Sequence, residues 1–178
     1  TAGALMAPAA LVKPVAAWRK NLGQLLSPET AALLSRSLRT LPVRIRQHND
    51  NAMIVAHAME QNPKVRRVLY PGLAGFPDHT LAAGQMDGFG GMLTLELEAD
   101  RTQTAAVADQ LKVFLLATSL GGVESLVSQP CATSHHAIGQ EERHRRGISD
   151  GMLRLSVGLE QAEDLVADLQ QAIDAVLL

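Results

Sequence analysis

Two segments, 92–97 and 152–157, place an apolar side chain at every second position, and this alternation most constrains the fold. The alternating apolar residues are Leu93, Leu95 and Leu97 in the first segment and Leu153, Leu155 and Val157 in the second. Because successive side chains of a strand point to opposite faces, a period of two predicts strands with one buried face. The two segments therefore predict a sheet that is covered on one side, and they place Arg154 on the opposite face.

Helical spacing predicts three long helices around these strands. Ser27-Pro28-Glu29 predicts a helix start, since Ser can cap, Pro suits the first position and Glu favours the positive end of the dipole; that helix runs through Leu38. Pro42 opens a second helix and Pro63 ends it. Apolar spacing of three and four residues places one face of the second helix and of a final helix against a core. These faces are Ile45, His48, Ala52, Val55 and Met59 in the second helix, and Ala162, Leu165, Val166, Leu169, Ile173 and Val176 in the final one.

Shorter elements complete an α/β pattern. Residues 65–70 are rich in β-formers and stop at Pro71-Gly72, 102–111 are predicted as a helix, and 113–117 are predicted as a buried strand. Strands that alternate with helices indicate an α/β domain with a small sheet, covered mainly on one face by helices. Periodicity does not fix the direction of the strands.

Composition excludes several classes of protein. The chain has 178 residues, enough for one domain with a core, and its formal charge of -2 without a basic run argues against a nucleic-acid surface. No apolar run is long enough to span a bilayer, and residues 1–8 lack the basic flank of a signal peptide. A single cysteine, Cys131, excludes an internal disulfide framework and favours a reducing compartment.

Arg154 and the segment that begins at Ser119 are the candidates for chemistry. An arginine held on a strand presents a planar fork that suits a carboxylate; the alternative is a surface arginine paired with an acidic side chain. The pair Gly121-Gly122 lets the backbone approach a ligand closely; the alternative is a plain turn after a buried strand. Glu124 and Ser125 follow directly and could line the same wall.

Other polar clusters predict no site. Cys131, His135, His136 and His144 match no closed zinc pattern, so no metal site is expected. The glycines between Gly84 and Gly91 do not sit between a strand and a helix start, which argues against a phosphate loop. The basic residues Arg143, Arg145 and Arg146 are expected to form a solvated helix end.

Six motifs, in order and spread over nearly the whole chain, carry a family resemblance. They are 33–41 (LLSRSLRTL), 46–52 (RQHNDNA), 70–73 (YPGL), 88–92 (GFGGM), 119–126 (SLGGVESL) and 148–160 (ISDGMLRLSVGLE). The chain resembles the C-terminal part of the Cys/Met-metabolism enzymes, the trans-sulfuration family that depends on pyridoxal phosphate (PLP). It departs from the family at Ser37, where a glycine is usual, and at Thr133-Ser134-His135, where the family has Met-Thr-His.

The resemblance implies a fold and a site. The fold would be the small C-terminal domain of a fold-type I PLP-dependent transferase, with a mostly antiparallel sheet. Arg154 would bind the α-carboxylate of the substrate, with Ser119 and the Leu120 backbone beside it, and Glu124 would lie in a segment that varies with reaction type. No lysine of the chain stands in the family's Ser-x-Thr-Lys context, so no catalytic or cofactor-binding residue is expected here, and no PLP on this chain alone.

The expected biological unit follows from the same resemblance. Residues 1–41 would end the large PLP-domain region, 42–178 would form the carboxylate-binding domain, and a lysine-bearing N-terminal domain would be the main partner. The complete enzyme would be a cytoplasmic homotetramer, a dimer of dimers, performing β- or γ-elimination or replacement on small sulfur amino acids, with cystathionine γ-synthase or γ-lyase favoured. The alternative is a non-catalytic binding or assembly module, which the reading frame upstream of Thr1 would distinguish.

Overall fold

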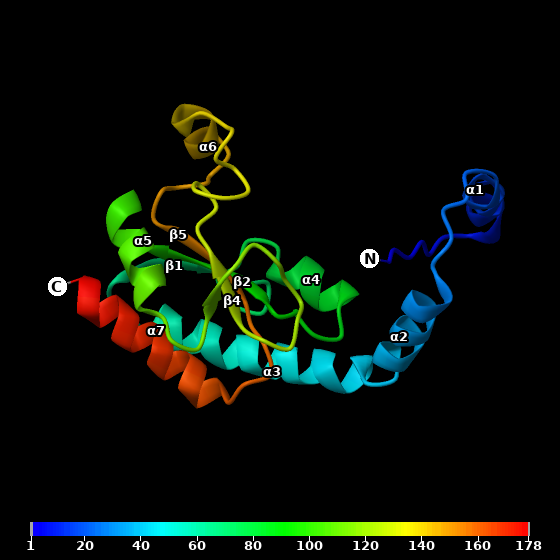
Figure 1. Cartoon of the computed structure of the whole chain (residues 1–178). Coiled ribbons are helices and arrows are strands. Elements are labelled where there is room, and N and C mark those ends of the chain that lie inside the picture. The colour runs from blue at the N-terminus through cyan, green and yellow to red at the C-terminus, as the bar shows by residue number, and fades with distance from the viewer. Residues whose placement is uncertain (1, 178) are drawn as a thin grey trace. The chain divides into compact units, whose positions relative to one another are not determined.

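A computed structural model describes residues 2–177, and the chain divides into two compact units, one ending at Val43 and one starting at Arg44. The first unit holds α1 (Ala9–Asn21) and α2 (Pro28–Leu38), and α3 (Leu41–Glu60) leads into the second. The second unit contains the remaining elements (Figure 1). They are β1 (Val65–Leu69), α4 (His79–Gln85), β2 (Met92–Leu97), α5 (Arg101–Gln110), β3 (Leu115–Leu116), β4 (Leu126–Ser128), α6 (Gln140–Arg145), β5 (Met152–Ser156) and α7 (Ala162–Val176).

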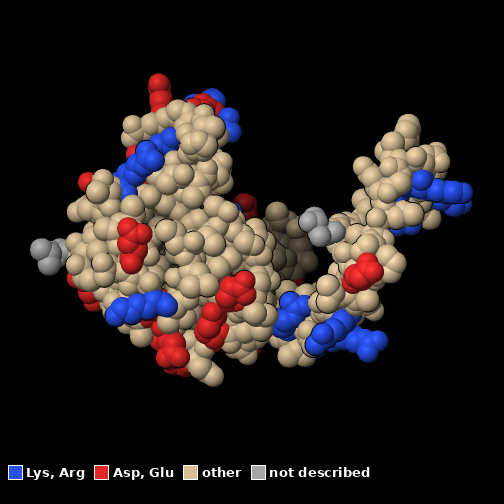
Figure 2. Space-filling view, viewed as in Figure 1, with Lys and Arg blue, Asp and Glu red and all other residues tan. Residues whose placement is uncertain are grey.

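The first unit is helical and has little interior. The predicted start of α2 is confirmed: the Ser27 hydroxyl accepts a hydrogen bond from the Thr30 amide at 3.2 Å, and Pro28 takes the first helical position. Neither α1 nor α2 contains a buried residue, and Trp18 is 64% exposed. In Figure 2, most of the visible surface of this unit is uncharged. These helices therefore present an apolar surface without a core of their own.

The second unit is built on a five-stranded sheet in the order β1-β2-β5-β4-β3. The neighbouring strands β1, β2, β5 and β4 pair antiparallel, whereas β3 runs parallel to its neighbour β4. Thr94 and Ser128 flank Arg154 across the central strand β5. Because neighbours in register share a face, one side of the sheet is polar at its centre. We call it the polar face, consisting of Thr94, Glu96, Ser128, Arg154 and Ser156.

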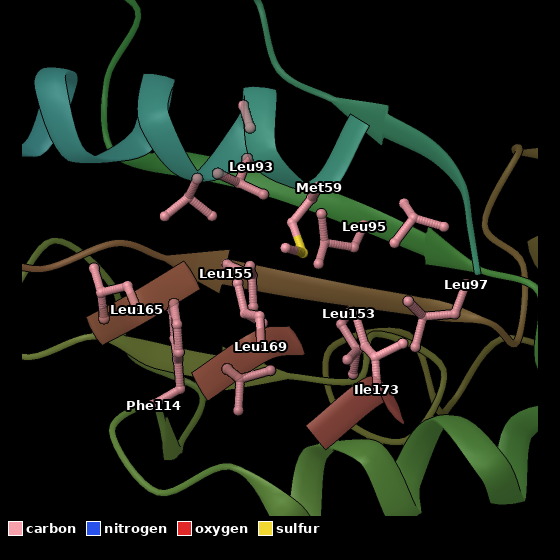
Figure 3. Close-up of a cluster of buried hydrophobic side chains, with 14 of the residues drawn as sticks. Met59, Leu93, Leu95, Leu97, Phe114, Leu153, Leu155, Leu165, Leu169 and Ile173 are labelled. Carbon is pink, nitrogen blue, oxygen red and sulfur yellow. The ribbon is translucent and has the colours of Figure 1, made fainter. Parts of the chain in front are cut away.

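The opposite face of the sheet carries the core, as its alternation predicts. Leu93, Leu95 and Leu97 of β2 are at most 2% exposed, and they pack with Leu153 and Leu155 of β5. Figure 3 shows Met59 of α3 and Leu165, Leu169 and Ile173 of α7 converging on these leucines. Val107 of α5 and Phe114 belong to the same cluster. The prediction of an α/β domain with helices on one face of a mostly antiparallel sheet is confirmed.

One residue of the predicted buried face of α3 lies elsewhere. His48, Ala52, Val55 and Met59 are buried as expected, but Ile45 is 45% exposed. It lies in the first turns of α3, ahead of the part of the helix that contributes to the sheet's core. The helical period alone could not show where along α3 the sheet ends.

The predicted buried strand over 113–117 is wrong in length and burial. The strand β3 is two residues long, and Leu115 and Leu116 are 54% and 61% exposed. It is an edge strand, bonded only to β4. Before it, the Asp168 carboxylate on α7 accepts the amides of Lys112, Val113 and Phe114 at 2.8–3.1 Å, so these residues do not pair with a strand.

The expectation of three solvated arginines at one helix end is wrong for Arg143. Arg145 and Arg146 are exposed and pair with Glu142 along α6. Arg143 is only 6% exposed; it bonds Asp150 at 3.0 Å and the Ile138 carbonyl at 2.7 Å. A charge this buried requires such partners, and here they tie α6 back to the start of β5.

No helix in the described range 2–177 combines the length and the apolar character needed to cross a membrane.

Candidate functional site

Arg154 projects from the centre of the polar face and keeps part of its guanidinium free. Its Nη2 donates to the carbonyls of Thr118 and Ser119, at 3.2 and 3.1 Å. Among residues 2–177, Nε and Nη1 have no hydrogen-bond partner, and no carboxylate forms an ion pair with this arginine. The side chain is partly exposed. A guanidinium oriented by main-chain carbonyls, with donors left over, suits an incoming carboxylate.

The two carbonyls belong to a loop, 117–125, that β5 holds at its middle. The Ser156 hydroxyl accepts a hydrogen bond from the Gly121 amide at 2.8 Å. Gly121 has φ of +73°, a left-handed conformation that glycine adopts without strain. The glycine pair noted in the sequence therefore forms the turn of this loop, and Ser156 lies two residues beyond Arg154 on the same strand and face.

The far end of the loop is fastened to the segment that follows β5. The Leu159 amide donates to the Val123 carbonyl at 2.8 Å. The Glu160 carboxylate accepts the Ser125 amide at 2.7 Å and the Ser125 hydroxyl at 2.8 Å. The same hydroxyl oxygen accepts the Gly158 amide at 2.8 Å. Both carboxylate oxygens of Glu160 are thus engaged by one serine.

Helix α3 holds the segment after β5 from the other side. His48 Nδ1 lies 2.7 Å from the Val157 carbonyl, and because a carbonyl only accepts, Nδ1 carries the hydrogen. The Asn51 side-chain amide donates to the carbonyls of Gly158 and Glu160, at 3.0 and 2.8 Å. Both side chains are buried. The segment 157–160 therefore keeps its position independently of the loop.

The structure brings two of the four predicted site residues together. Arg154 and Ser119 meet, but through the Ser119 carbonyl rather than its exposed side chain. Leu120 is 56% exposed, and no hydrogen bond within the described chain joins Leu120 or Glu124 to Arg154. Sequence reasoning missed the contacts that shape the loop, made by Thr118, Ser156 and Glu160. The only signal was that Ser156 and Glu160 fall inside one recognised motif and Ser125 inside another.

The cysteine and histidines outside this site form no metal centre in the described part of the chain. No three potential ligands among His, Cys, Asp and Glu gather there. Cys131 is buried, and its burial, followed by the nearby Asp150 carboxylate, raises the pKa of the thiol. A protonated, buried thiol is a poor nucleophile.

The fold defines the class of structure first: the chain matches the C-terminal part of a cystathionine γ-synthase structure. The structure of cystathionine gamma synthase from Xanthomonas oryzae pv. oryzae, in complex with aminoacrylate and cysteine, superposes with a TM-score of 0.88 at 45% identity. The match covers 94% of this chain and 43% of that one.

The sequence then defines the family. Residues 1–174 match the model of the Cys/Met metabolism PLP-dependent enzymes, and the chain belongs to this family. It is 41% identical over 175 residues to cystathionine gamma-synthase 1, chloroplastic, of Nicotiana tabacum, covering 98% of this chain and 32% of that protein. It is 45% identical over 152 residues to cystathionine beta-lyase of Coxiella burnetii, covering 85% and 39%. The chain thus spans well under half the length of these relatives.

Proposed function

We propose that this chain supplies the substrate α-carboxylate site of a PLP-dependent trans-sulfuration enzyme. The enzyme would carry out β- or γ-elimination, or γ-replacement, on sulfur amino acids or precursors such as cystathionine and O-acylhomoserine. The observation that best supports this proposal is the geometry of Arg154 on the polar face. The carbonyls of Thr118 and Ser119 orient its guanidinium, and its Nε and Nη1 donors remain free within the described chain. This geometry supports a bidentate carboxylate contact.

Three residues beside Arg154 complete the proposed substrate wall. Ser119 acts through its carbonyl, which orients the guanidinium, and its exposed hydroxyl is available to the substrate. The Leu120 backbone has no hydrogen bond within the described chain, so its amide can donate to a carboxylate oxygen. Glu124 is exposed near the end of the same loop, where it would contact the variable part of a substrate.

The described lysines of the second unit do not fit the attachment of PLP, because neither belongs to the polar face. Lys64 is paired with Asp174 of α7 at 2.8 Å, on the helical side of the sheet. The Lys112 amide is bound by Asp168, also on α7. Lys13 and Lys20 lie in α1 of the other unit. PLP supplies an electron sink for carbanion chemistry when bound, and we propose that a lysine-bearing domain outside this chain holds it.

The proposed partner of the first unit is that lysine-bearing domain, within a homo-oligomeric enzyme. Leu11, Trp18 and Leu33 are each more than 60% exposed, and apolar surface of this extent marks an interaction site. We place the domain boundary at 41–42, and we propose a homotetramer in the cytoplasm, where an unpaired Cys131 stays reduced. The exposed helices equally support the second candidate, an assembly module without its own cofactor.

Kinetics of the complete, PLP-loaded enzyme test the proposed function. Replacing Arg154→Ala removes a charge-assisted contact worth roughly 1.5–3 kcal/mol, so KM for the amino-acid substrate should rise about 10- to 100-fold. The matched control is Arg146→Ala, an exposed arginine that directly follows α6, which should leave KM unchanged. An unchanged KM in Arg154→Ala would overturn the carboxylate assignment, and a native gene that encodes no lysine-bearing domain ahead of Thr1 would favour the assembly module.

A further inference from the structure

We propose that Glu160 and Ser125 are positioning residues that set the geometry of the Arg154 site by clamping the loop 117–125. This inference rests on the proposed function, because it takes Arg154 as the group that binds substrate. Neither side chain has a hydrogen bond to Arg154. Their effect would reach the guanidinium only through the loop backbone.

The clamp is a directional chain of hydrogen bonds. The Gly158 amide donates to the Ser125 oxygen, and the Ser125 hydroxyl spends its single hydrogen on Glu160 Oε2. The other carboxylate oxygen accepts the Ser125 amide at 2.7 Å. A carboxylate accepts both donors at once, whereas an amide in its place would turn a donor toward one of them. Hydrogen bonds to an ionised acceptor are also the stronger kind.

The clamp fixes one end of the loop whose other contacts orient Arg154. Ser156 holds the Gly121 amide in the middle, and the carbonyls of Thr118 and Ser119 then receive Arg154 Nη2. If the clamp opens, the bonds at Gly121 and Val123 remain inside the loop, and its ends stay bonded through the Ala117 amide to the Val127 carbonyl and the Leu115 amide to the Ser125 carbonyl. The carbonyls of Thr118 and Ser119 would then become more mobile, and the orientation of the Arg154 guanidinium plane would no longer be fixed. A bidentate contact depends on that plane.

The clamp is separable from the stability of the fold. His48 and Asn51 of α3 hold the segment 157–160 without help from the loop. Glu160 is partly exposed, and Ser125, although buried, lies just before β4, which pairs with the edge strand β3. Removing the clamp should therefore loosen the loop while the core around β5 stays folded.

The first test is a split between KM and kcat in the complete, PLP-loaded enzyme. Glu160→Gln and Ser125→Ala should each raise KM for the amino-acid substrate about 10-fold, with kcat within about twofold. The double variant should show no more than the larger single effect, because one clamp is lost in either case. Glu163→Gln, an exposed carboxylate three residues along without a side-chain partner in the described chain, is the control.

The second test needs no turnover. Amide hydrogen exchange should quicken in peptides covering 117–126 in Glu160→Gln, while peptides of β2 and β5 keep their wild-type protection. Unchanged exchange and unchanged KM would overturn the clamp. If, in that case, Arg154→Ala still raises KM, the proposed function stands without the clamp. If exchange quickens but neither Arg154→Ala nor Glu160→Gln changes KM, the clamp exists and the proposed function fails.

Discussion

Asp168 shows how one buried side chain can decide the path of a whole segment. Its carboxylate, on a residue 5% exposed, takes up the amides of Lys112, Val113 and Phe114. Asp168→Ala leaves these donors without partners, so the free energy of unfolding should fall by about 2–4 kcal/mol. Urea unfolding measures this, with Asp164→Ala on the exposed side of α7 as control. Equal midpoints for the two variants would contradict the assignment.

Gly158 illustrates the opposite case, a position where the absence of a side chain matters. A Cβ placed there would collide with the Val123 carbonyl and the Glu160 carboxylate, and would lie 2.7 Å from the Glu124 carbonyl carbon. Gly158→Ala should therefore destabilise the chain by about 1–3 kcal/mol, the usual range for overpacking. Gly75→Ala, with open space around its Cβ, should change stability by less than about 0.5 kcal/mol. Thermal unfolding compares the two variants. Equal changes in Tm would contradict close packing between the loop 117–125 and the segment that follows β5.

At the scale of elements, α6 depends on an ion pair that acid should break. Burial raises the pKa of Asp150, but the hydrogen bond and charge of Arg143, the charge of His144 and the Gln140 amide outweigh it, so the net pKa lies below its ordinary value. Because the pKa of Asp150 is lower in the folded chain, its carboxylate stabilises the fold at pH values above the unfolded-state pKa of about 3.9. This stabilisation is lost as the pH falls through the lower pKa of the folded state. The urea midpoint of wild type should exceed that of Asp150→Asn at pH 7. The difference should shrink below about pH 4, and a difference independent of pH would contradict the role of the pair.

Elements differed in how much of them the sequence revealed. β2, β5 and α7 were predicted because the apolar side chains that each adds to the core follow a single period. The short elements α4 and β4 were not, since they depend on contacts between distant segments rather than on a pattern of their own; of α6, only its basic end was expected. β3 looked buried because its residues are apolar, yet an edge position leaves both exposed. In the site, Arg154 followed from strand alternation and the resemblance, but the bonds between Ser125 and Glu160 join positions 35 residues apart and left no periodic trace.

At the scale of the whole molecule, the two units differ in what holds them together. The second unit has a hydrophobic core of buried leucines packed against its sheet, whereas the apolar side chains of the first unit are exposed. A unit without a core gains little from burial by itself. The stability of α1 and α2 should therefore come from whatever covers them in the complete protein.

Trp18, the only tryptophan of the chain, makes this dependence measurable. It is 64% exposed on α1, so a 5-fluorotryptophan label there should give a solvent-exposed ¹⁹F resonance in the chain alone. If the PLP-binding domain covers α1, adding that domain should shift the resonance and protect the indole from acrylamide quenching. Trp18→Gln should weaken this association, because burying a large aromatic ring contributes about 1.5–3 kcal/mol. An exposed label in the assembled enzyme would show that α1 faces solvent there, and the apolar surface would then need another partner.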